Sequence, residues 1–149
     1  MERRGVVLAG VDGTDSGRAA LRTAAGEAVS AGLRLVALHV RRSPRPLELM
    51  AWETYPLAEQ WRDELELEAW LQCTLLLAEL PVEWEYAVVD GEPAQALRSF
   101  ADERSAHSVY VGSRIRTGWA ARLHRCPALE LSRRSPCRVR VVRFPDVPV

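Results

Sequence analysis

Residues 109–142 read VYVGSRIRTGWAARLHRCPALELSRRSPCRVRVV, and they contain the pattern strand, glycine-entered loop, helix, strand. The apolar segments Ser108–Val111 and Arg138–Val142 are typical of buried parallel strands. Between them, the sequence predicts a loop that begins at Gly112 and a helical pattern that starts near Trp119 and restarts at Pro127. In an α/β protein, backbone N–H groups at such a helix start can bind phosphate. The stretch therefore predicts a parallel sheet with a candidate anion site.

The same alternation of strand and helix runs through the rest of the chain. Further strands are expected at 5–11, 33–40 and 82–89, and further helices at 16–31, 55–80 and 93–104. The turn 12–15 should cap the first helix and Gly32 should end it, while Pro93 suits a first helical position. This order predicts a single α/β domain over 1–149, an open, doubly wound five-stranded parallel sheet with helices on both faces. Ligands bind such sheets at the carboxyl ends of the strands, where Asp12, Val40, Gly91 and Gly112 are expected.

Composition excludes several classes of protein. The chain has 149 residues with 48% hydrophobic and 27% charged side chains, which is ordinary globular usage. It contains no apolar run long enough to span a membrane and no signal-like start. Three cysteines without CxxC spacing indicate reduced thiols and a cytoplasmic location. The histidines show no metal-ligand spacing and no serine lies in a nucleophile elbow, so we expect neither a metal site nor an enzyme.

Charge is strongly polarised along the chain. The net charge is zero, but residues 1–47 carry +4, residues 48–103 carry −12 and residues 104–149 carry +8. These blocks could pair within one subunit or between two, and the sequence leaves both possibilities open. Only Trp119 lies within the basic loop, whereas nucleic-acid surfaces usually interleave basic and aromatic side chains, so we expect no nucleic-acid partner.

The long helix 55–80 has more apolar residues than one face needs. We assign to the core the stripe formed by Leu57, Trp61, Leu65, Ala69, Cys73, Leu76 and Leu80. Four more residues lie off that stripe: Leu67, Trp70, Leu71 and Leu77. Either the loop 47–56 covers them or a partner does, and we favour the loop because connecting segments often shield such residues.

Five segments in the same order and spacing resemble the universal stress protein family. They are GVDGTDSGRAALRTAAGEA (10–28), LHV (38–40), DGEPAQAL (90–97), VYVGSR (109–114) and SRRSPCRVRVVR (132–143). The resemblance implies a flavodoxin-like sheet of strand order 3-2-1-4-5, a homodimer and, in most members, no catalytic chemistry. It also implies that Asp12 lies beside a nucleotide site and that the backbone of Val40 matches the position that meets adenine.

One branch of that family binds ATP through a loop patterned G-x-x-G, nine residues, then G-S or G-T. Gly112 matches the first glycine, but Ile115, Arg125 and Cys126 stand at the other three positions. A β-branched residue at positive φ costs about 1–2 kcal/mol, and Pro127 has no N–H to offer. Two lost charge-assisted hydrogen bonds amount to about 3–6 kcal/mol, or about a hundred- to ten-thousand-fold in affinity.

The sequence therefore predicts a homodimeric regulatory or interaction protein with a degenerate nucleotide loop and no cofactor. The alternative is a switch that binds ATP or another anion through arginine side chains, which can grip phosphate themselves. The vestigial or weak nucleotide crevice would comprise Asp12, Gly13, Thr14, Val40, Gly112, Arg114, Arg125 and Cys126. The dimer would form along the last strand, with Val139, Val141 and Val142 as its apolar part.

Overall fold

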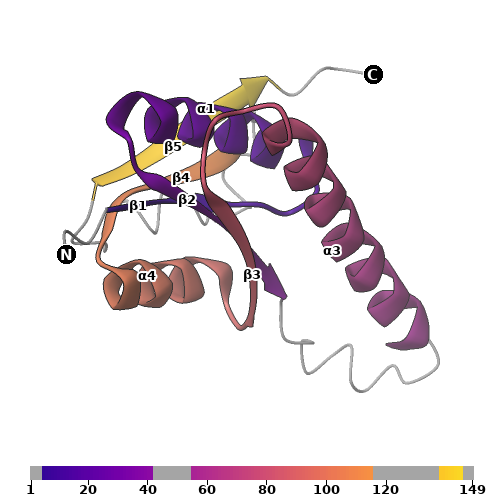
Figure 1. Cartoon of the computed structure of the whole chain (residues 1–149). Coiled ribbons are helices and arrows are strands. Elements are labelled where there is room, and N and C mark those ends of the chain that lie inside the picture. Colours follow the sequence, from indigo (N-terminus) through magenta and orange to yellow (C-terminus); the bar gives the residue numbers. More distant parts are fainter. Residues whose placement is uncertain (1–4, 42–54, 116–137, 146–149) are drawn as a thin grey trace.

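A computed structural model describes residues 5–41, 55–115 and 138–145, and Figure 1 shows their arrangement. The strands are β1 (Val6–Gly10), β2 (Arg34–Arg41), β3 (Trp84–Asp90), β4 (Ala106–Ile115) and β5 (Arg138–Pro145). The helices are α1 (Asp15–Ala31), α3 (Tyr55–Leu77) and α4 (Pro93–Arg104). All pairs of neighbouring strands are parallel and the sheet order is β3-β2-β1-β4-β5, so the predicted fold class and strand order are confirmed.

The helix boundaries follow from local chemistry that the sequence displays. Thr14 is the N-cap of α1, and Gly32 ends the helix in the left-handed region at φ 68°. Pro93 starts α4, where the side chain of Glu92 accepts a hydrogen bond from the N–H of Ala94. These boundaries are confirmed to within one residue of the predicted ones.

Consecutive side chains of a strand point to opposite sides of the sheet, so each central strand contributes residues to two cores, one on each face. One core lies under α1 and α3 and includes Val7, Ala9, Leu21, Ala25, Leu35 and Tyr110. The other lies under α4 and includes Leu8, Val36, Leu38, Leu97, Ala101 and Val109. The helices therefore cover both faces of the sheet, as Figure 1 shows.

Two predicted boundaries around the basic segment are wrong. β4 does not end before Gly112 but continues to Ile115, with Gly112 opposite Val142 and Ile115 opposite Pro145 in β5. β5 correspondingly runs past Val142 to Pro145. The helix predicted after Trp119 falls outside the described residues.

The predicted core stripe of α3 is correct only in its middle, because α3 ends at Leu77 and Leu80, the last predicted member, is 38% exposed. Ala69 and Cys73 are buried, but Leu57 is 67% exposed and Trp61 62% exposed, while Leu77, which we placed off the stripe, is 1% exposed. The reason is geometric: each step of four residues turns 400°, so a chain of such steps rotates by about 40° each time. The N-terminal members have therefore rotated away from the sheet.

No helix in the described segments is long and apolar enough to cross a membrane.

Gly112 and Gly26 provide a matched pair of glycines for a stability test. A Cβ at Gly112 would overlap the carbonyl group of Ser16 and lie 2.8 Å from the nitrogen of Gly17, whereas a Cβ at Gly26 meets nothing within 4 Å. We expect Gly112→Ala to lower the free energy of unfolding by about 3 kcal/mol through overpacking. Gly26→Ala should raise it by about 0.5–1 kcal/mol because Gly26 lies within α1. Urea unfolding measures both, and equal effects would contradict the close packing of α1 on β4.

Candidate functional site at the carboxyl edge of the sheet

The Asp12 carboxylate accepts hydrogen bonds within the turn that follows β1. Asp12 Oδ1 accepts hydrogen bonds from the N–H of Thr14 at 3.0 Å and from the Thr14 hydroxyl. Thr14 Oγ1 in turn accepts from the N–H of Gly17 at 3.2 Å, which caps the helix. Asp12 remains exposed at the edge of the sheet, but the geometry here is that of a capping turn.

Gly13 lies against α3. Its φ of 81° suits glycine, and an added Cβ would lie 2.9 Å from the carbonyl oxygen of Leu65. The side-chain N–H of Gln72 donates to the Gly13 carbonyl at 3.1 Å. The other end of that amide, Gln72 Oε1, is buried and has no hydrogen-bond partner among the described residues.

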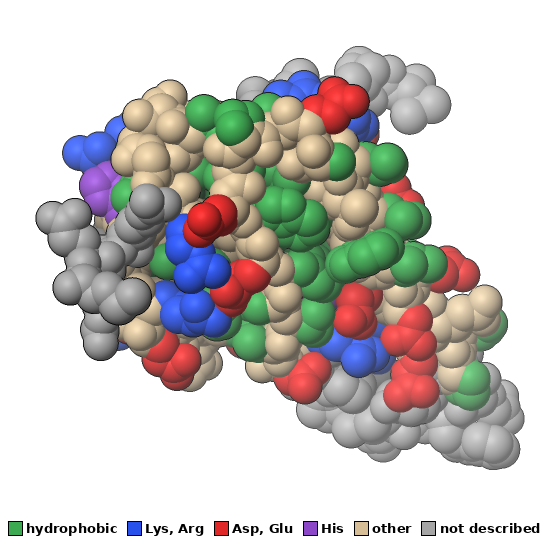
Figure 2. All heavy atoms as spheres, in the orientation of Figure 1, with side chains coloured by type: hydrophobic (Ala, Val, Ile, Leu, Met, Phe, Trp, Pro, Cys, Tyr) green, Lys and Arg blue, Asp and Glu red, His purple; other side chains and the backbone are tan. Residues whose placement is uncertain are grey.

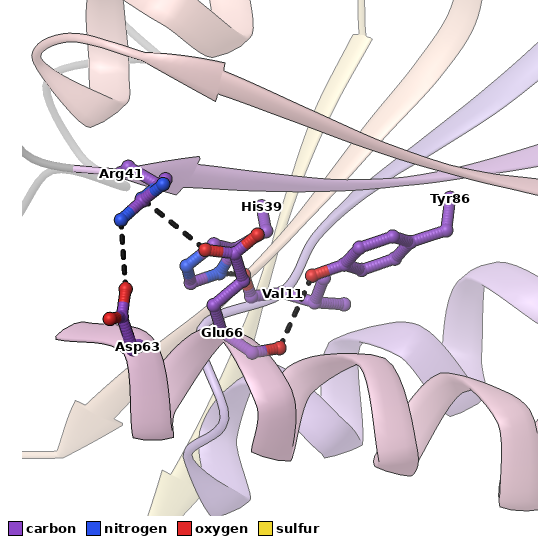
Figure 3. Close-up of polar contacts among 6 residues, drawn as sticks. All are labelled: Val11, His39, Arg41, Asp63, Glu66 and Tyr86. Carbon is purple, nitrogen blue, oxygen red and sulfur yellow. Dashed lines mark hydrogen bonds and ion pairs between the residues drawn. The ribbon is translucent and has the colours of Figure 1, made fainter. Parts of the chain in front are cut away.

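The carboxyl end of β2 is held by polar contacts to two neighbouring elements (Figure 3). His39 is 5% exposed, and its Nδ1–H donates to the carbonyl of Val11 at 2.8 Å. Arg41 forms ion pairs with Asp63 at 2.9 Å and with Glu66 at 3.3 Å, both on α3. Val40 lies between them in sequence, half-buried and paired in register with Val89. These contacts fix the carboxyl end of β2 to the turn after β1 and to α3.

Gly112 packs against the first turn of α1, so its lack of a side chain serves this contact. The first turn of α1 also lies close to Asp12, because a Cβ added to Gly17 would overlap the Asp12 carboxylate. This helical turn therefore contacts both Gly112 and the Asp12–Thr14 turn. Arg114 lies in β4 opposite Phe144, and its side chain falls outside the described residues. Arg125 and Cys126 also lie outside them. The structure thus brings together Asp12, Gly13, Thr14 and Gly112.

A hollow of about 360 Å³ lies beside the end of β3, away from these residues. It is lined by the turn at Gly91 and by α4, and its charged groups are Asp90, Glu92 and Glu103. Three carboxylates repel phosphate, so this hollow does not suit the predicted anion. Gly91, which was expected beside Asp12 and Gly112, lines this hollow.

Cys73, Tyr86 and Tyr110 have raised pKa values, which favour their neutral forms. Burial raises the pKa of the Cys73 thiol to about 12, so this free cysteine is a poor nucleophile at neutral pH. Burial also raises the pKa of Tyr86, with the nearby Cys73 and Glu66 adding to it. Tyr110 has a raised pKa from burial and from its hydrogen bond with Glu27. Within 5–41, 55–115 and 138–145, no three histidine, cysteine or acidic residues cluster as metal ligands.

Sequence reasoning missed His39 and Gln72 as residues that shape this edge. Each is a polar residue within an otherwise apolar pattern: His39 in the strand that follows Leu33, and Gln72 between Ala69 and Cys73. A buried polar side chain must find a hydrogen-bond partner, so each pointed to a specific contact. Periodicity gave no indication of which backbone carbonyl that partner would be.

Comparison with known proteins identifies relatives over nearly the whole chain. The model of the universal stress protein family matches residues 4–143. A solved universal stress protein UspA from Lactobacillus plantarum is 19% identical, with a TM-score of 0.70 over 96% of this chain and 100% of that one. A universal stress protein in complex with cAMP is 23% identical, with a TM-score of 0.61 over 95% and 98%. One from Archaeoglobus fulgidus in complex with dAMP is 20% identical, with a TM-score of 0.62 over 95% and 99%. No curated protein matches the chain significantly.

The capping role of Thr14 can be tested against a second threonine of the same helix. Thr14→Ala removes the acceptor for the Gly17 N–H and should lower the free energy of unfolding by about 1 kcal/mol. Thr23→Ala is the control, because Thr23 is exposed within α1 and alanine is the better helix former. Chemical denaturation followed by circular dichroism measures both; an unchanged stability of Thr14→Ala would disprove the capping role.

Proposed function

The chain belongs to the universal stress protein family, and from that membership we propose a homodimeric, non-catalytic regulatory or interaction protein that does not bind ATP tightly. The proposal retains the fold of the family.

The observation that carries the proposal is the extended backbone of β4 beyond Gly112. Gly112, Ser113, Arg114 and Ile115 all pair with β5. A phosphate-binding loop needs a turn in which successive N–H groups converge on one anion. Extended, paired backbone points successive N–H groups in opposite directions, so it does not form such a turn.

The turn after β1 supports the same conclusion. The Asp12 carboxylate already accepts two hydrogen bonds from Thr14, and Gly13 packs against α3. The carbonyl of Val11 is engaged by His39. A nucleotide at this edge would have to replace contacts that the free protein already makes, which lowers its net affinity.

The alternative function is an anion-binding switch. It is supported by the solved relatives in complex with cAMP and dAMP and by the arginines of the basic segment. In that case Arg114 and Arg125 would hold the anion through guanidinium groups rather than through backbone N–H groups. ATP would then be a ligand of moderate affinity.

The absence of tight ATP binding can be tested by thermal shift with millimolar ATP and Mg²⁺. A ligand at a hundred times its Kd adds about 2.7 kcal/mol of stability, so a Kd near 10 μM would give a clear shift at 1 mM. We expect no shift for the wild-type chain. The fourfold variant Ile115→Gly, Arg125→Gly, Cys126→Ser and Pro127→Val should create one if the backbone argument is right. A wild-type shift that Arg114→Ala with Arg125→Ala abolishes would establish the alternative instead.

The predicted dimer can be tested through the position of β5 at one edge of the sheet. Val139 and Val141 pack partly on the α4 side of the sheet and Val142 on the α1 side, so each is half-buried within its own subunit. Sedimentation at micromolar concentration should show a dimer that Val142→Arg weakens by at least tenfold. The control Val88→Arg alters β3, the opposite edge strand, and should leave the dimer intact. A wild-type monomer would remove this part of the proposal.

A further inference from the structure

Helix α3 carries a second apolar face that points away from the sheet. Its members recur at alternating steps of four and three residues, which is the spacing of one seam along a helix. We call it the outer stripe of α3, and it consists of Leu57, Trp61, Glu64, Glu68, Leu71 and Leu75. Leu67 and Trp70 widen the apolar surface on one side.

Every residue of this stripe is exposed in the single chain. Leu75 is 77% exposed, and the large side chains Leu57 and Trp61 are more than half exposed. Figure 2 shows hydrophobic side chains gathered along α3 with acidic side chains beside them. Large apolar side chains exposed together at both ends of one stripe mark an interaction site. Leu67, Trp70 and Leu71 are also exposed, and residues 47–54 of the loop expected to cover them lie outside the described residues.

The two glutamates determine which partner fits. Leu57 and Trp61 lie at one end of the stripe and Leu71 and Leu75 at the other, with Glu64 and Glu68 between them. If two copies packed antiparallel about a two-fold axis, Glu64 of one copy would face Glu68 of the other, and vice versa. Four like charges would then meet at the centre of a partly dehydrated contact, where they repel strongly. A second copy of this chain is therefore a poor occupant.

The surroundings of the stripe remain acidic even though some of the acidic residues of α3 form ion pairs within the subunit. Asp63 and Glu66, on other sides of α3, bind Arg41 and hold the helix to β2. The block 48–103 contains two arginines against fourteen acidic residues. The field around the stripe thus favours a cationic partner.

We propose that the outer stripe of α3 binds an amphipathic cationic helix of another protein, with apolar side chains at both ends and lysine or arginine opposite Glu64 and Glu68. From Leu57 to Leu75 the stripe spans about 27 Å, the length of a partner helix of about five turns. Helix-in-groove and helix-on-helix recognition use the same apolar anchors at steps of three and four. The inference specifies a partner for the proposed interaction role, and it does not depend on nucleotide binding.

The test uses the full chain and a defined probe. The probe is an 18-residue fluorescent peptide of leucine and lysine, patterned as an amphipathic helix and read by anisotropy at neutral pH. A peptide of the same composition in scrambled order, without an apolar face, is the reference. We expect the patterned peptide to bind at least tenfold more tightly than the scrambled one.

Two double variants then locate the contact. Leu71→Ser with Leu75→Ser removes exposed apolar anchors, and Glu64→Gln with Glu68→Gln removes the central charges; each should weaken binding at least tenfold. Glu59→Gln with Glu79→Gln is the matched control, because it also removes two exposed carboxylates but outside the stripe. It should change the affinity less than twofold.

Several results would overturn the proposal. Equal binding of both peptides, or equal loss in the control variant, would show attraction by net charge alone. Wild-type self-association at neutral pH that Leu71→Ser with Leu75→Ser abolishes would make a second copy the occupant. The thermal-shift result with ATP is independent of all these outcomes, so failure here leaves the nucleotide proposal standing and the reverse also holds.

Discussion

The contact between the first turn of α1 and Gly112 of β4 determines the geometry of the carboxyl edge. The helix approaches the strand so closely that no side chain fits at position 112. This contact places the Asp12–Thr14 turn over the sheet, and that turn in turn caps α1 through Thr14. Because parallel sheets present their ligand sites at this edge, one packing contact decides how much of the edge stays available. Here a glycine that the sequence pattern assigns to phosphate binding is used to pack a helix on a strand.

The features that the sequence predicted correctly depend on local chemistry. Thr14, Gly32 and Pro93 each act within one turn of a helix, so their neighbours in sequence suffice to interpret them. Alternation of strands and helices predicts a parallel sheet but not which strand lies at its centre. The strand order could be predicted only when the family resemblance was added to that alternation. The edge position of β5 is confirmed on that combined basis.

The predictions that failed concern residues with two possible roles. Gly112 can begin a loop or admit a helix, and only the position of α1 in space distinguishes these. The leucines of α3 form two apolar faces, and periodicity alone does not say which of them meets the sheet. Leu77 and Cys73 pack inward because the C-terminal half of α3 lies over the core, whereas Leu57 belongs to the half held by Arg41. His39 and Gln72 were recognisable as polar residues within apolar patterns, but their partners are backbone carbonyls far away in sequence.

The acidic middle block of the chain lies between two basic blocks, and this arrangement affects which partner α3 can bind. Arg34 pairs with Glu83 and Glu85, and Arg104 also pairs with Glu85, so basic residues from both outer blocks meet the acidic middle block within one subunit. These pairs are exposed, and each contributes at most about 1 kcal/mol to stability. Their larger effect is selective: they neutralise acidic side chains at β3, as Arg41 does for Asp63 and Glu66 of α3, whereas Glu64 and Glu68 lie among exposed leucines. The acidic side chains of this surface repel a second copy and its apolar side chains are exposed to water, whereas a cationic amphipathic helix would match both properties at once.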